Sequence, residues 1–296
     1  MESAPLSWDL LGAFLAVMRT GSLSGASRSL GVAQPTVRRQ IETLEEVLGT
    51  VLFTRSQTGL TATEAAKATL PYAESMASVA EALVRSVSAP SEGDNGTVRV
   101  ACSEVMGVAV LPPMLADLRR AYPRLQIELS ASNANEDLLR RDADVAVRMA
   151  QPTQGALVAK RVGTVKLGVF AAESYLADHA VPRSIADLAS GHALVGKDRD
   201  TSFLDALAAV GLPLKRRDLA LRTDSDAAYI ASVRAGVGIG ICQLPIADGP
   251  PRLRRLLPKG SFELPIWVVT HEDLRASRRV SIVFEHLVAS LGKYIR

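Results

Sequence analysis

Apolar residues return every three or four positions near the start of the chain, which is typical of amphipathic helices that pack on one another. From residue 10 to residue 48 this pattern predicts three short helices, with breaks at Thr20-Gly21 and at Gly31. Ser22 or Ser24 is placed to cap the second helix, and Pro35 suits the first turn of the third. The positions predicted to face inward are Leu11, Phe14, Leu15, Met18, Ala26, Leu30, Val37, Ile41, Leu44 and Leu48.

The third helix combines its apolar stripe with a polar face that carries two arginines. A short helix, a glycine turn and a helix of this kind make a helix-turn-helix, whose second member enters the major groove of DNA with its N-terminal residues leading. The alternative interpretation is that all three helices are core elements of a soluble domain. If the helix does bind DNA, the side chains that face the groove are Gln34, Pro35, Thr36, Arg38 and Arg39.

Motif residues recur in a fixed order along this stretch, at Phe14, Gly21 to Ser24, Ala26, Leu30, Gln34, Pro35, Val37, Arg39, Ile41, Leu44, Glu45, Leu48, Gly49, Leu52, Phe53 and Arg55. In these positions the stretch resembles the LysR-type transcriptional regulators. Two positions depart from the usual pattern, because Arg38 stands where the family commonly has Ser and Gly25 where it commonly has Ala. The base or phosphate contact at position 38 is therefore expected to differ from the family's. The resemblance implies that Ser24 and Arg55 also contact DNA.

A strand, a turn at Thr58-Gly59 and a second strand are predicted within residues 51–63, and such a hairpin beside a helix-turn-helix is a wing. Arg55 lies on its first arm, where it either meets a phosphate or is an exposed surface arginine. A long helix with an apolar stripe is predicted from residue 63 to about residue 88, and Pro71 is predicted to kink or break it. The resemblance implies a linker helix that pairs with its copy in a dimer, whereas the alternative is packing on its own domain.

Polar turn-forming residues fill positions 89–96, which we interpret as a linker between domains. Beyond it, strand and helix patterns alternate, which favours a parallel sheet with right-handed crossovers, arranged here as two small lobes. Strands are predicted at 97–102, 125–130, 143–148, 166–171, 193–195, 219–221, 238–243 and 262–270, and helices at 103–121, 135–141, 174–177, 184–188, 202–210, 226–235 and 277–294.

Short motifs recur in order along these lobes, at Leu111-Pro112, Tyr122-Pro123, Asp144 to Arg148, Tyr175-Leu176, Pro182, Asp187-Leu188, Ala235 to Ile239, Pro265 and Trp267. In these positions the lobes resemble the effector domain of the same regulators, which in turn is similar to periplasmic solute-binding proteins. The predicted fold class is α/β with an N-terminal all-α winged helix-turn-helix and an effector domain of two Rossmann-like lobes. The predicted domains are the winged helix-turn-helix at 1–63, a dimerising linker helix at 64–89, a hinge at 90–96 and the effector-binding domain at 97–296. Its first lobe is expected at about 97–162 and 268–296, and its second at about 163–267.

In open parallel sheets, ligands bind beyond the carboxyl ends of the strands. Ser103 follows a predicted strand and opens a helix, where its hydroxyl and the free amides behind it suit an organic acid or another anion. A plain helix cap is an equally good interpretation of Ser103. Asp224 and Asp226 would oppose a strongly anionic ligand unless they are paired. The candidate effector-binding residues are Ser103, Ser132, Asn133, Ser202, Thr223 and Asp224.

Charge sets a limit on how the chain binds DNA. Lys and Arg together number 34 and Asp and Glu 31, for a net charge of +3, so this is no polybasic binder. Binding must come from a few well-placed cations, which a dimer would double. Within residues 1–60 the five cations Arg19, Arg28, Arg38, Arg39 and Arg55 are matched by the five carboxylates Glu2, Asp9, Glu42, Glu45 and Glu46.

The remaining signals argue against other classes of protein. Cys102 and Cys242 lie far apart and form no disulfide framework, while no signal peptide or apolar run of membrane-spanning length is evident, so a cytoplasmic location is expected. The glycines at 236, 238 and 240 follow a predicted helix and lead into a strand, which is the reverse of a dinucleotide fingerprint. The four histidines lack metal-ligand spacing. We therefore expect no cofactor, no metal and no enzymatic activity.

The hypothesis is a LysR-type regulator that binds double-stranded DNA as a homodimer or homotetramer and responds to a small-molecule effector, such as an organic acid, between its lobes. RNA polymerase is a further candidate partner, and no membrane partner is expected. A dimer would place two reading helices about 34–36 Å apart, which fits a roughly palindromic site. The alternative is a solute-binding or enzymatic α/β protein whose N-terminal helices serve in assembly.

Overall fold

The chain folds into two compact units, one that extends to Ser86 and one that begins at Val87. The predicted helix at 135–141 and Thr58 of the predicted turn lie outside the described residues. No helix among the described residues has both the length and the apolar character needed to cross a bilayer. The computed structural model describes residues 6–56, 59–87, 93–133, 143–152, 157–189, 191–199, 202–209, 211–258 and 262–296.

The first unit begins with the three predicted helices, α1 (Trp8–Thr20), α2 (Leu23–Leu30) and α3 (Gln34–Leu48). Ser22 caps α2, because its hydroxyl accepts a hydrogen bond from the Gly25 N–H at 3.1 Å, and Ser24 does not serve as the cap. Gly31 ends the helix with φ +68°, a left-handed conformation that costs other residues free energy. The short α2, the glycine turn and α3 form the predicted helix-turn-helix.

Buried residues from all three helices form the core of this unit, among them Phe14, Ala26 and Leu44, each 0% exposed. Two positions predicted to face inward do not. Leu30 and Leu48 are each 40% exposed. They are the last residues of α2 and α3, where the helices extend past the core, so helical spacing alone overestimated the stripe.

The wing is an antiparallel pair of β1 (Phe53–Ser56) and β2 (Gly59–Ala62). The Leu60 N–H donates to the Gly21 carbonyl at 2.9 Å, which fastens the wing to the turn between α1 and α2. The long helix α4 (Glu64–Val87) follows and runs without interruption through Pro71, so the predicted break is absent. Its exposed apolar side chains are Tyr72, Met76, Val79, Leu83 and Val84.

The second unit is built around one mixed sheet with the strand order β10-β6-β11-β5-β3-β4, and β9 also pairs with β6. Only part of it is parallel as predicted: β3 pairs in parallel with β4 and β5, whereas β6, β9, β10 and β11 pair antiparallel. The strands are β3 (Gly96–Cys102), β4 (Leu125–Ala131), β5 (Val145–Arg148), β6 (Leu157–Ala171), β9 (Gly240–Gln243), β10 (Arg254–Leu256) and β11 (Phe262–His271).

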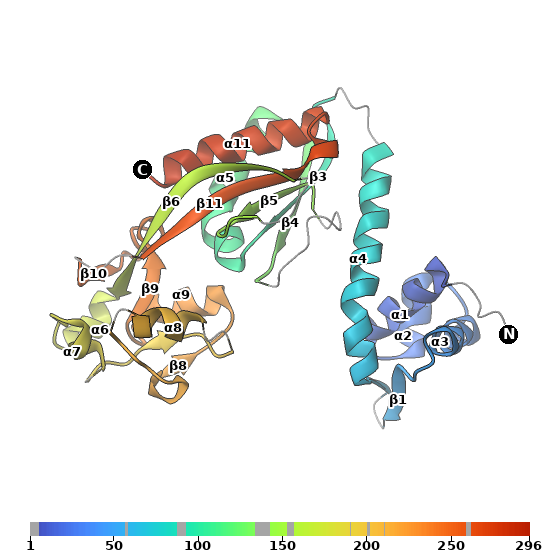
Figure 1. The fold of residues 1–296 in the computed structure, drawn as a ribbon, viewed down its shortest axis with the longest axis horizontal. Helices are drawn as coiled ribbons and strands as arrows, with labels where there is room; N and C mark the ends of the chain where they lie inside the picture. The colour runs from blue at the N-terminus through green and yellow to red at the C-terminus, as the bar shows by residue number, and fades with distance from the viewer. Residues whose placement is uncertain are drawn as a thin grey trace. The chain divides into compact units, whose positions relative to one another are not determined.

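The long strands β6 and β11 run from one lobe to the other (Figure 1). In the larger lobe, helices cover β3, β4 and β5. They are a helix that includes a π-helical segment (Met106–Val110), α5 (Leu111–Ala121) and α11 (Arg278–Tyr294). The smaller lobe contains the other elements, which are α6 (Glu173–Ala177), α7 (Ile185–Ala189), β7 (Val195–Gly196), α8 (Ser202–Ala209), a 3₁₀ turn (Arg216–Asp218), β8 (Leu221–Arg222), α9 (Asp226–Arg234) and α10 (Leu244–Ala247).

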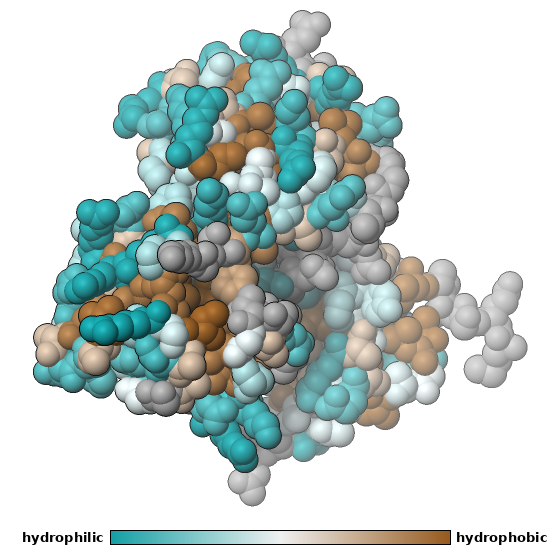
Figure 2. All heavy atoms as spheres, turned by 60° about the vertical axis from the view of Figure 1, so that its left-hand side comes forward, coloured by the Kyte–Doolittle hydropathy of each residue, from teal (hydrophilic) through white to brown (hydrophobic). Residues whose placement is uncertain are grey.

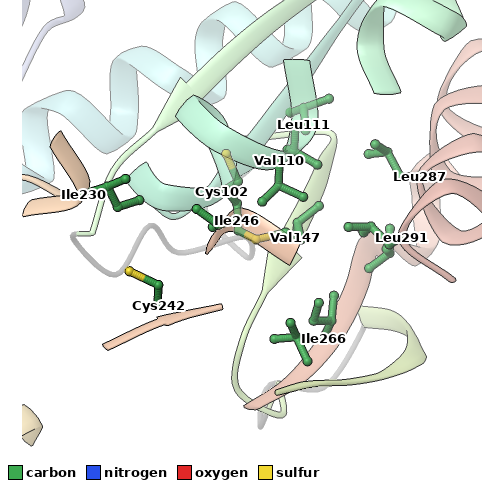
Figure 3. Packing of buried hydrophobic residues seen from close by; sticks show 14 of the residues in the cluster. Cys102, Val110, Leu111, Val147, Ile230, Cys242, Ile246, Ile266, Leu287 and Leu291 are labelled. Atoms are coloured by element: carbon green, nitrogen blue, oxygen red, sulfur yellow. The ribbon is translucent and has the colours of Figure 1, made fainter. Parts of the chain in front are cut away.

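One apolar core joins the lobes. Leu287 and Leu291 of α11 point toward the strands that carry Val147 and Ile266, and Ile230 of α9 belongs to the same cluster (Figure 3). A second core lies within the smaller lobe. Apolar side chains also gather on the surface of that lobe, framed by polar ones (Figure 2). The exposed apolar residues of the smaller lobe include Val181, Ile185 and Val237.

Pro112 and Pro113 disturb the helix that follows β3. The helix takes a π-helical form over Met106–Val110 and returns to α-helical form at Leu111. Each proline lacks an N–H and would clash with the carbonyl four residues before it, so a local widening relieves the clash. Elsewhere, Arg254 and Arg255 belong to strand β10, and their backbone pairs with β6.

Candidate nucleic-acid interface and effector site

The exposed face of α3 carries all five side chains that the sequence assigned to the groove. Gln34, Pro35, Thr36, Arg38 and Arg39 are exposed, and Val37 between them is fully buried with Ile41 and Leu44. Burial of one stripe fixes the rotation of the helix, so the polar stripe must face outward. Among the described residues, neither arginine of this face forms an ion pair that would occupy it.

The amino end of α3 is also open to an anion. Its cap is Ala33, which offers no side-chain hydrogen bond, and no acidic residue lies in its first turn. The first amides of a helix and the helix dipole attract negative charge, such as a phosphate. Pro35 adds a fixed backbone angle in this turn at no cost in hydrogen bonds.

Two further predicted DNA contacts lie on neighbouring elements. Ser24 is half-buried on α2, where its carbonyl accepts a hydrogen bond from the Ser27 hydroxyl. Arg55 is exposed on β1, opposite Leu60 of the wing. The wing is held against α3 as well, because Glu45 accepts hydrogen bonds from the Leu52 and Phe53 amides at 2.6 and 3.2 Å.

Polar side chains from both lobes of the second unit meet where β3 and β8 end. We call Glu104, Asn133, Lys197, Ser225 and Asp226 the junction cluster. Four of these residues, Glu104, Lys197, Ser225 and Asp226, were not among the predicted site residues, although an acid in the first turn of a helix is a recognisable signal. Ser103, which was predicted, directly precedes Glu104. Its hydroxyl is buried and has no hydrogen-bond partner among the described residues, so it does not cap the helix.

Glu104 binds the amino end of α9 in the smaller lobe. Its carboxylate accepts hydrogen bonds from the Ser225 hydroxyl at 2.8 Å, the Asp226 N–H at 2.7 Å and the Ala227 N–H at 3.4 Å. Burial raises the pKa of the Glu104 carboxyl, but these hydrogen bonds and the charge of Lys197 outweigh it, so the pKa lies below its ordinary value. The carboxylate is therefore ionised near neutral pH.

Asp226 makes the reverse connection. Its carboxylate accepts hydrogen bonds from the Val105 N–H and from the Asn133 amide, both at 3.1 Å, and forms an ion pair with Lys197. The side chains of Lys197 and Asp226 are 18% and 15% exposed, so solvent screens this pair less than a surface pair. Asn133 also accepts the Glu104 N–H at 3.1 Å, which places this predicted residue inside the junction cluster.

The other predicted effector residues have structural partners or lie apart. Asp224 accepts hydrogen bonds from the Asp198 and Arg199 amides and from the Arg199 guanidinium, and those from Arg199 lower its pKa to about 2. The Thr223 hydroxyl accepts the Ser225 N–H at 3.2 Å. The Ser132 N–H donates to the Cys102 carbonyl at 2.9 Å. Ser202 begins α8, and its side chain lies outside what the structure describes.

An apolar cavity lies elsewhere, inside the smaller lobe. Its lining comes from the second core and includes Leu188, Leu207 and Ile239. Its volume is about 30 Å³, which accommodates little more than one water molecule or methyl group. It is too small for a metabolite.

Comparison with known proteins decides the family. The profile described as "Bacterial regulatory helix-turn-helix protein, lysR family" matches residues 8–67, and "LysR substrate binding domain" matches residues 91–292. The chain belongs to the LysR family of transcriptional regulators. The HTH-type transcriptional activator TtdR of Escherichia coli strain K12 is 27% identical over 294 residues, 98% of this chain and 94% of that protein.

Solved structures agree with this assignment. CrgA, a LysR-type transcriptional regulator from Neisseria meningitidis, is 26% identical with a TM-score of 0.60, over 98% of this chain and 100% of CrgA. CbnR, solved in complex with its target DNA, shares the fold with a TM-score of 0.65 and 21% identity, over 96% of this chain and 100% of CbnR.

The family assignment settles the two hypotheses drawn from the sequence. This LysR-type regulator is a DNA-binding transcriptional regulator with a helix-turn-helix domain and a substrate-binding domain, and it is not an enzyme. The alternative of a solute-binding or enzymatic protein with an assembly domain is wrong. The predicted fold class is confirmed. LysR-type regulators bind DNA and small-molecule effectors and form oligomers.

Proposed function

We propose that this LysR-type regulator reads an operator in the major groove with the amino-terminal half of α3. Gln34, Thr36, Arg38 and Arg39 face the base edges and phosphates, and Pro35 holds the first turn against them. Ser24 and Arg55 contact the DNA backbone from α2 and the wing. The observation that supports this most is the exposed polar face of α3 opposite the buried Val37, Ile41 and Leu44.

The regulator acts as a homodimer or homotetramer in the cytoplasm, where it reaches the chromosome and RNA polymerase. The exposed apolar side chains of α4, such as Leu83 and Val84, support pairing of this helix with its copy. We assign 1–63 to the DNA-binding domain, 64–89 to the linker helix, 90–96 to the hinge and 97–296 to the effector domain. Within the effector domain, one lobe takes about 97–162 and 268–296, and the other about 163–267.

A small-molecule effector, an organic acid or a similar metabolite, binds between the lobes beside the junction cluster. Ser103 supports this placement, because its buried hydroxyl lacks a partner among the described residues and such a group is costly unless something binds it. The predicted residue Asn133 belongs to the junction cluster, because its side-chain amide donates a hydrogen bond to Asp226. Thr223 and Asp224 shape the adjoining loop, and Ser132 and Ser202 complete the proposed site. The effector acts by favouring one arrangement of the lobes over another.

The test of DNA reading is a salt-dependent gel shift with the promoter fragment that the protein protects from nuclease. Arg39→Ala should weaken binding by about 1–3 kcal/mol, or roughly five- to 150-fold, because a base or phosphate contact is lost. Arg19→Ala is the matched control, because Arg19 is exposed at the end of α1, outside the α3 face. An unchanged affinity in Arg39→Ala would refute the assignment of α3 as the reading helix.

A further inference from the structure

Two helices meet at the junction cluster, the helix after β3 and α9. The amino end of each helix binds a carboxylate from the other helix. Glu104 lies in the first turn of the helix after β3, and it accepts the Asp226 and Ala227 amides of α9. Asp226 lies in the first turn of α9, and it accepts the Val105 amide of the helix after β3. The exchange joins positions 121 and 122 residues apart.

These contacts fill the places where an external anion would otherwise bind. The free amides at the start of a helix are a ready site for a carboxylate or phosphate. Here the Val105 amide already holds Asp226, and the Asp226 and Ala227 amides hold Glu104. An anionic ligand that reaches the junction must compete with a carboxylate that belongs to the chain.

We propose that Glu104 and Asp226 form a reciprocal latch between the lobes, and that an anionic effector releases it by replacing the Asp226 carboxylate at the Val105 amide. This proposal rests on the proposed function, because it takes the effector to bind beside the junction cluster. The ligand class is a small carboxylate or another anion of similar size. Replacement frees Asp226 from the larger lobe and leaves the Glu104 half of the latch in place, so the lobes are joined by fewer contacts and can change their arrangement.

Asp226 is the member that the effector replaces, for two reasons. The donors around it would remain to bind the incoming anion: the Val105 N–H, the Asn133 amide and the Lys197 ammonium, with the unpartnered Ser103 hydroxyl one residue before Glu104. Glu104 has three donors on the smaller lobe, because two backbone amides and the Ser225 hydroxyl all donate to it.

The latch is tested by chemical rescue of the full-length protein. Asp226→Ala removes the carboxylate, so amide hydrogen exchange at Val105 should become faster and the melting temperature should fall. Sodium acetate should slow that exchange again and raise the melting temperature in a saturable manner, whereas sodium chloride at equal ionic strength should not. Glu263→Ala is the control, because Glu263 is an exposed carboxylate on β11. Unaltered exchange at Val105 in Asp226→Ala would overturn the latch.

Competition by the chain's own carboxylate is measured by acetate binding. Acetate should bind Asp226→Ala at least about tenfold more tightly than wild type, because in wild type the site is open for only a small fraction of the time. Equal acetate affinity in the two proteins would overturn the replacement step. Asp226→Asn keeps the shape and one acceptor oxygen, so it provides a folded comparison for Asp226→Ala, with exchange at Val105 expected between those of wild type and Asp226→Ala.

The outcome for the latch is separable from the outcome for DNA binding and effector response. Acetate rescue of Asp226→Ala depends on the junction cluster alone, whereas the gel shift depends on α3. If acetate rescues Asp226→Ala but the wild type binds no promoter fragment, the latch is supported and the proposed function is refuted. If the wild type binds its promoter but acetate does not rescue Asp226→Ala, the proposed function is supported and the latch is refuted.

Discussion

The two regions that carry polar side chains for binding differ at the amino ends of their helices, which are open in one region and bound to carboxylates in the other. In the first unit, α3 begins with no acidic residue in its first turn and with exposed Gln34, Thr36 and Arg38. In the second unit, the helix after β3 and α9 each have a carboxylate in the first turn and bind the other's carboxylate. The open amino end of α3 can bind a phosphate directly. At the junction, an anionic ligand can bind a helix end only by replacing the carboxylate that is already bound there.

The largest expected effect tests whether the two regions fold as separate units. Phe14 is fully buried, and its ring centroid lies 5.8 Å from that of Phe53. Phe14→Ala should destabilise the first unit by about 3–5 kcal/mol, through lost burial and a cavity. Calorimetry should show one transition moving while the transition of the second unit stays in place, and Phe170→Ala should do the reverse. A single transition shifted by both variants would show that the units unfold together.

The next prediction concerns a variant in which α3, like the helices of the junction, has an acid in its first turn. Thr36→Glu introduces an acid at the exposed amino end of α3, where it should repel DNA phosphates. Operator affinity should fall by about tenfold or more, while the melting temperature stays unchanged or rises slightly, because the acid complements the helix dipole. Thr50→Glu makes the same charge change beyond the other end of α3. Equal losses in the two variants would indicate a general charge effect and not a local one.

A smaller effect compares two serines that precede helices. The Ser22 hydroxyl accepts the Gly25 N–H, so Ser22→Ala should cost about 0.5–2 kcal/mol in the urea unfolding of the first unit. The Ser103 hydroxyl is buried without a partner among the described residues, so Ser103→Ala should not lower the stability of the second unit. Ser103→Ala should still reduce the response to effector while DNA binding persists. A stability loss in Ser103→Ala as large as that in Ser22→Ala would show that the hydroxyl has a structural partner.

The smallest effect is a pH dependence next to the junction. The pKa of Asp224 is lowered to about 2 from an ordinary 3.8, so its contribution to stability is fully present above the ordinary value and is lost as pH falls toward about 2. Asp224→Asn lacks this contribution. The stability difference between wild type and Asp224→Asn, measured by urea unfolding, should therefore narrow as pH falls through this window. A constant difference across it would mean that the Arg199 contacts do not hold the ionised form of Asp224.

The first unit could be predicted almost entirely from the sequence. Helix periodicity, the glycines that end helices and the polar face of α3 are local properties, and the predicted range for α3 agrees with the observed Gln34–Leu48. The exceptions are Leu30 and Leu48, whose exposure depends on where the core ends. In the second unit most strands and helices were placed within a few residues. Their mutual pairing was not, because the antiparallel β6, β9, β10 and β11 give the same local pattern as parallel strands.

The sequence by itself determined the helix-turn-helix, the family resemblance and the presence of two α/β lobes, because periodicity and ordered motifs belong to single segments of the chain. Only the tertiary structure decided that Glu104 meets Ser225 and that Asp226 meets Val105, across 121 positions in each case. A carboxylate at the start of a helix predicts that something charged or polar is stabilised there. Which helix end it binds depends on the segments that folding brings together in space.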